Sequence, residues 1–446
     1  MSPEIVSILA LVVIFAIATF LPINMGALAF VAAFLVGTLS VGLTTDEILG
    51  GFPAELVLTL IGVTYLFAIA QNNGTVDLLV RGAVRLVGGH VAAIPWIMFF
   101  VTALLTAIGA LSPAAVAIIA PIALTFAARH GISPLLMGMM VIHGAQGGGF
   151  SPISVYGVTV NTIVEDEGLP DASIQVFLGS LFFNLAIALV LFMVLGGRQL
   201  LGKKVSATPL EHVEHAHGTV VRGHGAAPGP AVGGDDDEHI HPEIAQPVRF
   251  EQVLTLVGLV AVAVLALVFD LDIGFVSITV AVVLALFSAQ EHKGAVSQIS
   301  WSTILLIAGV LTFVFVLQEA GTIDYVGEAV TGLGAPLLIA LLLCYIGGIV
   351  SAFASSTAII GVAISLAVPF LLDGDIASVG VIVALSVSST IVDVSPFSTN
   401  GALVLANAQD VDRDRFYKQI LAYATIVVVV GPLLAWLAFV VVPGWF

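Results

Sequence analysis

The sequence predicts an all-α protein that crosses a membrane many times and consists of two related halves of opposite orientation. Hydrophobic residues make up 59% of the chain and charged residues only 9%, and apolar runs of bilayer length recur from end to end. A phrase of the form S-P-x-S-x-x-G occurs twice, at 151–157 and at 395–401. All twelve Lys and Arg fall on one side when the runs are followed as crossings, which fixes an orientation.

Each half is predicted to contribute five spans. The first, Ile5 to Leu21, has no basic segment before it and no small-residue cleavage site after it, so it is expected to be retained rather than cleaved as a signal peptide. The repeated phrase interrupts the fourth span of each half. The predicted spans are 4–22, 24–42, 54–72, 134–163 and 173–196, then 251–269, 273–290, 300–318, 377–408 and 419–442.

A pair of shorter apolar helices precedes each fourth span. The first pair turns at Ser112-Pro113 and the second at 351–357. Each pair is either a re-entrant hairpin or two full spans, because both alternatives leave the direction of the next span unchanged. The pairs are 90–108 with 113–128 and 335–352 with 357–372, and the short amphipathic segments 75–88 and 322–334 are predicted to lie along the membrane surface.

Charges orient these spans. With the N-terminus outside, every basic residue falls inside and the outer loops carry only acids, so both termini are expected outside. The basic residues are Arg81, Arg85, Arg129, Arg198, Lys203, Lys204, Arg222, Arg249, Lys293, Arg413, Arg415 and Lys418, and the outer acids include Asp46, Glu47, Glu165, Asp171, Asp270, Asp272 and Asp373.

The repeat extends beyond the phrase. Residues 71–77 (QNNGTVD) align with 318–324 (QEAGTID), and Pro121 aligns with Pro369. Each half has an odd number of crossings, so the halves are inverted, as in alternating-access carriers; a duplication kept only for packing is the alternative. The predicted divisions are a first repeat at 1–198, a linker at 199–249 and a second repeat at 250–446.

The segment 199–249 is rich in Gly, Pro, His and acidic residues. It has too few apolar residues to form a core and is predicted to be a disordered cytoplasmic linker. Its histidines could bind a metal, although their spacing matches no tetrahedral zinc pattern. The net charge of −17 arises from acidic loops, and no basic surface suited to nucleic acid is present; the lone Cys344 excludes an intrachain disulfide.

Polar groups at membrane depth mark the predicted site. No Lys or Arg lies in a span, so an anion would be held by hydroxyls, amides and N–H groups at half-helix N-termini. A cation such as Na⁺ would be held by oxygens where the helices unwind. Residues predicted to bind substrate are Ser112, Ser151, Ser154, Tyr156, Ser355, Ser356, Thr357, Ser398, Thr399 and Asn400; those predicted to bind the cation are Ser112, Gly147, Asn161, Ser355, Ser389, Asp393 and Ser395.

Asp393 is the one carboxylate well inside a predicted span, and His143 lies inside the fourth span. Asp393 is expected to be a cation ligand or proton carrier; alternatively it is neutral and bonded to the hydroxyls of 388–390. His143 either serves proton coupling or substrate, or only satisfies a backbone carbonyl. Because Asp393 has no acidic counterpart in the first half, the second break is expected to be the stronger cation site and the first to shape the substrate pocket.

The segments 147–154 (GGGFSPIS) and 395–400 (SPFSTN) resemble the broken-helix signatures of the divalent anion:sodium symporters, and the chain is most similar to MatC-type dicarboxylate (malonate) carriers. The resemblance implies that Ser112, Ser355 and Thr357 at the hairpin tips contact substrate and sodium. It also implies a homodimer with fixed scaffold domains and moving transport domains, known as an elevator.

The sequence therefore predicts a secondary transporter of the inner (plasma) membrane, not an enzyme. It would take up a small dicarboxylate such as malonate or succinate with Na⁺, and H⁺ is the alternative coupling ion. A sodium/proton antiporter or inorganic-anion transporter on the same scaffold is the alternative, with Asp393 and His143 titrating. A membrane-embedded enzyme would have to pair Ser151 with His143, and no orienting acid is near.

Overall fold

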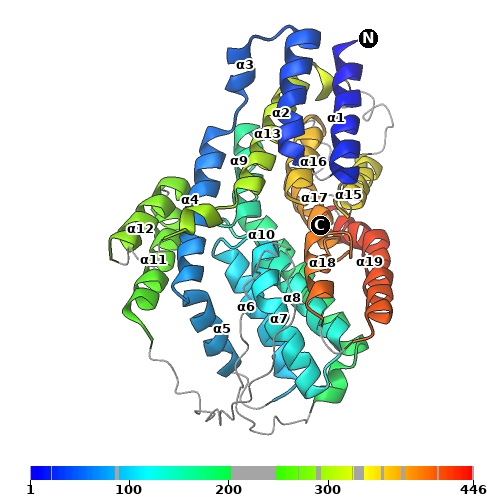
Figure 1. Cartoon of the computed structure of the whole chain (residues 1–446). Helices are drawn as coiled ribbons and strands as arrows, with labels where there is room; N and C mark the ends of the chain where they lie inside the picture. Colours follow the sequence, from blue (N-terminus) through cyan, green and yellow to red (C-terminus); the bar gives the residue numbers. More distant parts are fainter. Residues whose placement is uncertain are drawn as a thin grey trace, which may run out of the picture.

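The computed structural model confirms the helical fold (Figure 1). It describes residues 2–443 except 22, 86–89, 202–247, 270, 288–292, 324, 326–335, 353–355, 373–376 and 409–410. Most of the predicted linker (202–247 of 199–249) and most of the second surface helix, 322–334, thus lie outside the described residues. Within the described residues, six helices are long and apolar enough to cross a membrane.

The same order of helices occurs twice along the chain. In the first half the helices are α1 (Pro3–Phe20), α2 (Met25–Val36), α3 (Thr45–Gly50), α4 (Ala54–Asn72), α5 (Thr75–Arg85), α6 (Ala93–Ala107), α7 (Ser112–His130), α8 (Pro134–Gly148), α9 (Val155–Asp166) and α10 (Ser173–Val194). In the second they are α11 (Phe250–Leu267), α12 (Ile273–Phe287), α13 (Trp301–Glu319), α15 (Pro336–Ser351), α16 (Ser356–Leu372), α17 (Ser378–Ile391), α18 (Thr399–Ala406) and α19 (Arg413–Trp436).

Two features differ from the predicted spans. The short helix α3 was not expected; it forms because Thr44 and Glu47 make a capping box, in which each side chain bonds the backbone of the other. Helix α19 begins six residues before the predicted span, since Asp412 caps it by accepting N–H bonds from Asp414 and Arg415. The first turn of α19 is charged, so a prediction based on apolar runs did not include it.

Helices of one half pack against helices of the other. Helix α4 lies along α12, and α13 lies along α2; Figure 1 shows α11 and α12 beside α4, with α1 and α2 beside α13. Helix α7 likewise contacts α18, and α16 contacts α9. Such reciprocal pairing is what a two-fold relation between the halves produces.

The two reciprocal crossings α2–α13 and α12–α4 depend on matching glycines. A Cβ on Gly26 would lie 2.0 Å from the Leu305 carbonyl oxygen, and one on Gly309 would lie 2.0 Å from that of Gly26. At the other crossing, a Cβ on Gly62 would lie 2.6 Å from the Gly274 carbonyl oxygen. Since no side chain fits at these distances, glycine permits the helix backbones to touch.

Helices α8 and α17 form the centre of the molecule. Helix α8 packs between α6, α7 and α10, and α17 between α15, α16 and α19, while α10 also contacts α17. Residues 135–148 of α8 are all buried. The amide nitrogen of Gln146 donates to the Thr390 carbonyl at 2.9 Å and joins the two central helices. The breaks that follow α8 and α17 are thereby held close to one another.

Candidate functional site

Each copy of the repeated phrase folds into the same turn. In the first, the N–H and the hydroxyl of Ser154 both donate to the Ser151 carbonyl, at 2.8 and 2.7 Å. In the second, Ser398 donates to the Ser395 carbonyl in the same way, at 3.0 and 2.7 Å. Ser154 and Ser398 are the N-cap residues of α9 and α18. The serines of the phrase therefore satisfy backbone groups that the broken helix exposes.

The final glycine of the phrase has a steric reason. A Cβ on Gly157 would lie 1.9 Å from the Ser151 carbonyl oxygen, and one on Gly401 would lie 2.0 Å from that of Ser395. Any side chain would push the new helix away from the turn. Glycine is thus needed for α9 and α18 to begin directly beneath the break.

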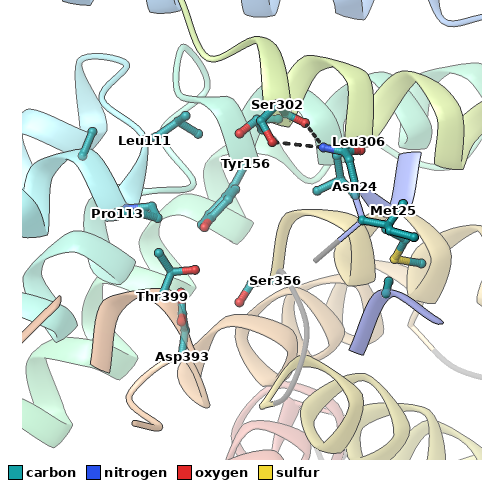
Figure 2. A pocket seen from close by; sticks show the side chains of 14 residues that line it. Asn24, Met25, Leu111, Pro113, Tyr156, Ser302, Leu306, Ser356, Asp393 and Thr399 are labelled. Carbon is teal, nitrogen blue, oxygen red and sulfur yellow. Dashed lines mark hydrogen bonds between the residues drawn. The ribbon is translucent and has the colours of Figure 1, made fainter. Parts of the chain in front are cut away.

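A cleft of about 540 Å³ lies between the breaks, the hairpin tips and the ends of α2 and α13. Figure 2 shows Tyr156, Thr399, Asp393 and Ser356 around it, with the phenol end of Tyr156 turned toward Thr399. Four residues predicted from sequence thus meet in one cavity, and they come from both halves of the chain. The remaining lining residues are Ala18, Ile23, Asn24, Met25, Leu111, Pro113, Ala114, Ser302, Thr303 and Leu306.

In the described part of the chain, six helices begin at this cleft. In each, the first, second or third residue lines the cavity. These residues are Met25 of α2, Pro113 of α7, Tyr156 of α9, Ser302 and Thr303 of α13, Ser356 of α16 and Thr399 of α18. A helix N-terminus carries unsatisfied N–H groups and about half a positive charge. Among the described residues no Lys or Arg lines the cleft, so the groups there that favour an anion are the backbone N–H groups of these helix starts.

Asp393 is the one carboxylate among the described residues that line the cleft. Its Oδ2 accepts a bond of 2.9 Å from the amide of Asn400, which also donates to the Ser112 hydroxyl at 2.8 Å. All three residues are buried, and the side-chain oxygen of Asn400 (Oδ1) has no hydrogen-bond partner. Asn400 thus links the tip of the first hairpin, at the start of α7, to the carboxylate of the second break.

The proposed bonding of Asp393 to the hydroxyls of 388–390 is wrong. The Thr390 hydroxyl donates to carbonyls of its own helix, at Ser386 and Val387. The hydroxyls of Ser388 and Ser389 are buried without a partner. Asn400, seven residues after Asp393, donates the hydrogen bond to the carboxylate instead.

Gly147, Ser389 and Asn161 do not line the cleft. Gly147 packs against α10 near Asn184, and Ser389 lies against Gly347 of α15. Asn161 is half-buried in α9. Ser355 and the side chain of Thr357 lie outside the described part of the chain. Their predicted roles stay predictions.

His143 is fully buried between helices rather than in the cleft. Its Nδ1 lies 2.8 Å from the side-chain oxygen (Oδ1) of Asn184, and its Nε2 bonds the Tyr423 hydroxyl. Since the Asn184 amide donates to the Ser180 carbonyl, Nδ1 carries the proton and Tyr423 donates to Nε2. The histidine therefore ties α8 to α10 and α19, and it is not placed to activate Ser151.

Sequence reasoning missed one wall of the cleft. Asn24, Ser302 and Thr303 lie at the starts of α2 and α13, and none of the three was among the residues predicted to bind substrate or cation. The Asn24 amide donates to the Ser302 carbonyl at 2.9 Å and to its hydroxyl at 3.0 Å. The available signal was an N-cap residue just before an apolar run, but it marks helix starts throughout the chain.

Comparison with known proteins agrees with this architecture. A family model described as the N-terminus of the dicarboxylate carrier protein MatC matches residues 1–149, which confirms the resemblance over that part of the chain. Among solved structures, the chain is similar to the YdaH transporter of Alcanivorax borkumensis, whose topology is described as unusual. The two share 13% identity over 98% of each chain, with a TM-score of 0.59. None of the curated proteins matches the chain.

A likeness at 13% identity bears on the fold alone. The fold is therefore similar to that of a known transporter. The six helices of spanning length in the described part of the chain indicate a protein that crosses the membrane several times.

Proposed function

We propose that this chain is a secondary carrier that takes up a small dicarboxylate, such as malonate or succinate, together with a cation. The observation that carries the proposal is the convergence of six helix N-termini on one cleft. They attract an anion without a basic side chain. The family match over residues 1–149 supports a dicarboxylate as that anion.

The size of the cleft suits this substrate class. Its volume of about 540 Å³ lies in the range of small-molecule sites. It exceeds the need of a four-carbon diacid, so ordered water would accompany the substrate, each molecule taking about 30 Å³.

Asp393 supplies the argument for coupling. A dianion entering a partly dry cleft beside an ionised carboxylate would be repelled. A Na⁺ ion or a proton at Asp393 removes this repulsion, so substrate and cation bind together more tightly than either alone. The side-chain oxygen of Asn400 (Oδ1), which has no hydrogen-bond partner, is a second oxygen suited to the cation. Na⁺ is the first choice because the surrounding groups are hard oxygen ligands, and H⁺ is the alternative.

Transport would follow an elevator route. The two hairpins and two broken helices would move as a transport domain against a scaffold that includes α2, α4, α12 and α13. In this proposal the repeats are 1–198 and 250–446, the 199–249 linker is cytoplasmic, and the termini lie outside the plasma membrane. The scaffold would mediate a homodimer, as the family resemblance implies.

A sodium/proton antiporter is the second candidate, because Asp393 is a buried acid in the cleft. His143 does not support this candidate as a second titrating group, because both of its ring nitrogens bond neutral side chains away from the cleft. The six helix N-termini favour an anion as the transported substrate, whereas a sodium/proton antiporter transports only cations.

The test is uptake into proteoliposomes. Labelled succinate and malonate are offered under an inward Na⁺ gradient, an inward H⁺ gradient, or neither. The proposal expects accumulation that requires one of the two gradients. If neither acid enters while Na⁺ drives a change of internal pH, the protein is an antiporter and the proposal is wrong.

A further inference from the structure

The wall of the cleft built by α2 and α13 is electrically neutral. Asn24 is the N-cap of α2, accepting the Gly26 N–H at 2.9 Å. Its amide is fixed to Ser302 by the two bonds described above. The anion proposed for this cleft therefore faces an amide and hydroxyls on this side.

The crossing that builds this wall exists twice in the molecule. Gly26 meets the backbone of α13, and Gly309 meets the Gly26 carbonyl oxygen. In the second crossing, a Cβ on Gly274 would lie 2.8 Å from the Thr59 backbone nitrogen, and Gly62 meets the Gly274 carbonyl oxygen. Each of these glycine contacts between α2 and α13 thus has its equivalent between α12 and α4.

This equivalence assigns counterparts to Asn24 and Ser302. Asp272 precedes α12 and accepts the Phe275 N–H at 2.7 Å, so it caps α12 as Asn24 caps α2. Glu55 is the second residue of α4, as Ser302 is the second residue of α13. Two acids therefore stand where the cleft wall has an amide and a hydroxyl. Glu55 is exposed and Asp272 half-buried, and the structure has no hydrogen bond between them.

We propose that Glu55 and Asp272 form the wall of the cleft in the opposite-facing state, and that their charges lower its affinity for a free dianion. The inference rests on the proposed function, since it requires the breaks and hairpin tips to move from one crossing to the other. By the predicted topology, the neutral wall of Asn24 and Ser302 faces the cytoplasm and the acidic wall faces outside. Binding from outside then depends more steeply on the coupling cation than binding from inside.

The kinetic test measures KM for succinate from each side, in right-side-out and inside-out vesicles. Replacing the acids together (Glu55→Ser with Asp272→Asn) should lower the outside KM by about three- to tenfold, with the inside KM unchanged. The reciprocal pair (Asn24→Asp with Ser302→Glu) should raise only the inside KM. Both effects should shrink at high ionic strength, because salt screens exposed charges. Asp46→Asn, on the same outer face in α3, serves as the matched control and should change neither KM.

Equal KM changes on both sides, or changes that salt does not reduce, overturn the inference even if the wild-type protein carries succinate. A cross-linking measurement keeps the test independent of substrate. Thr399 and Asn24 line the present cleft; by the offset of the repeated phrase, Val155 is the counterpart of Thr399. Cysteines at 399 and 24 should cross-link in one state, and cysteines at 155 and 272 in the other. If the 155–272 pair never cross-links in membranes, α12 and α4 do not form the second wall, whatever the cargo is.

Discussion

Replacing Asn400 by alanine removes the one side chain that bonds both the first hairpin tip and Asp393. The bond to the carboxylate contributes about 1.5–3 kcal/mol and the bond to the Ser112 hydroxyl about 0.5–1.5 kcal/mol. The loss of both is about 2–4.5 kcal/mol, which corresponds to roughly 30- to 2,000-fold in an equilibrium constant. We expect kcat/KM for succinate uptake by Asn400→Ala to fall within this range.

A double-mutant cycle tests the reason for the loss. If Asn400 holds the hairpin through Ser112, the pair Asn400→Ala with Ser112→Ala should lose less than the two single losses combined. The difference should be about 1 kcal/mol, or roughly fivefold. Asn407→Ala is the matched control, since its half-buried amide bonds only the Leu403 carbonyl of its own helix. Strict additivity, or a loss for Asn400→Ala no larger than the control, refutes the linking role.

Three further predictions follow from the same geometry. Gly401→Ala should abolish uptake while the protein still reaches the membrane, because the added Cβ would meet a backbone carbonyl. Gly82→Ala is the control and should transport normally, because its Cβ would meet nothing within 4 Å. Equal activity of the two variants would contradict the steric argument. Tyr423→Phe should lower the thermal stability in detergent by about 1–3 kcal/mol, since it leaves the buried Nε2 of His143 without a donor; an unchanged melting temperature would show that the network is dispensable. Asp393→Asn should make succinate binding independent of the cation, and a retained Na⁺ or H⁺ dependence would remove this carboxylate from the coupling site.

The helical architecture was predictable because lipid imposes a simple rule. Every spanning segment must satisfy its own backbone, so apolar length alone identifies α4, α10 and α13 with nearly correct ends. The same rule made the two polar phrases conspicuous. Helix α3 has neither apolar length nor membrane depth, and its capping box became meaningful only once the helix was seen.

The site was predictable in its location and only partly in its contacts. The sequence placed Tyr156, Ser356, Asp393 and Thr399 at depth, and the fold brings them to one cleft. It could not show that the serines of the repeated phrase form turns, because the sequence does not distinguish a serine that bonds a nearby backbone carbonyl from one that binds a ligand. Nor could it find Asn24, whose role depends on a contact across 278 residues.

Protection of a cysteine in the cleft tests the central claim most directly. The native Cys344 is buried, so Thr399→Cys supplies a single accessible thiol among the first residues of α18. We predict that succinate, in the presence of the coupling cation, slows its reaction with a membrane-impermeant maleimide, whereas acetate does not. A labelling rate that saturating succinate and malonate leave unchanged, with Na⁺ or at low pH, would contradict the account that this cleft carries a dicarboxylate.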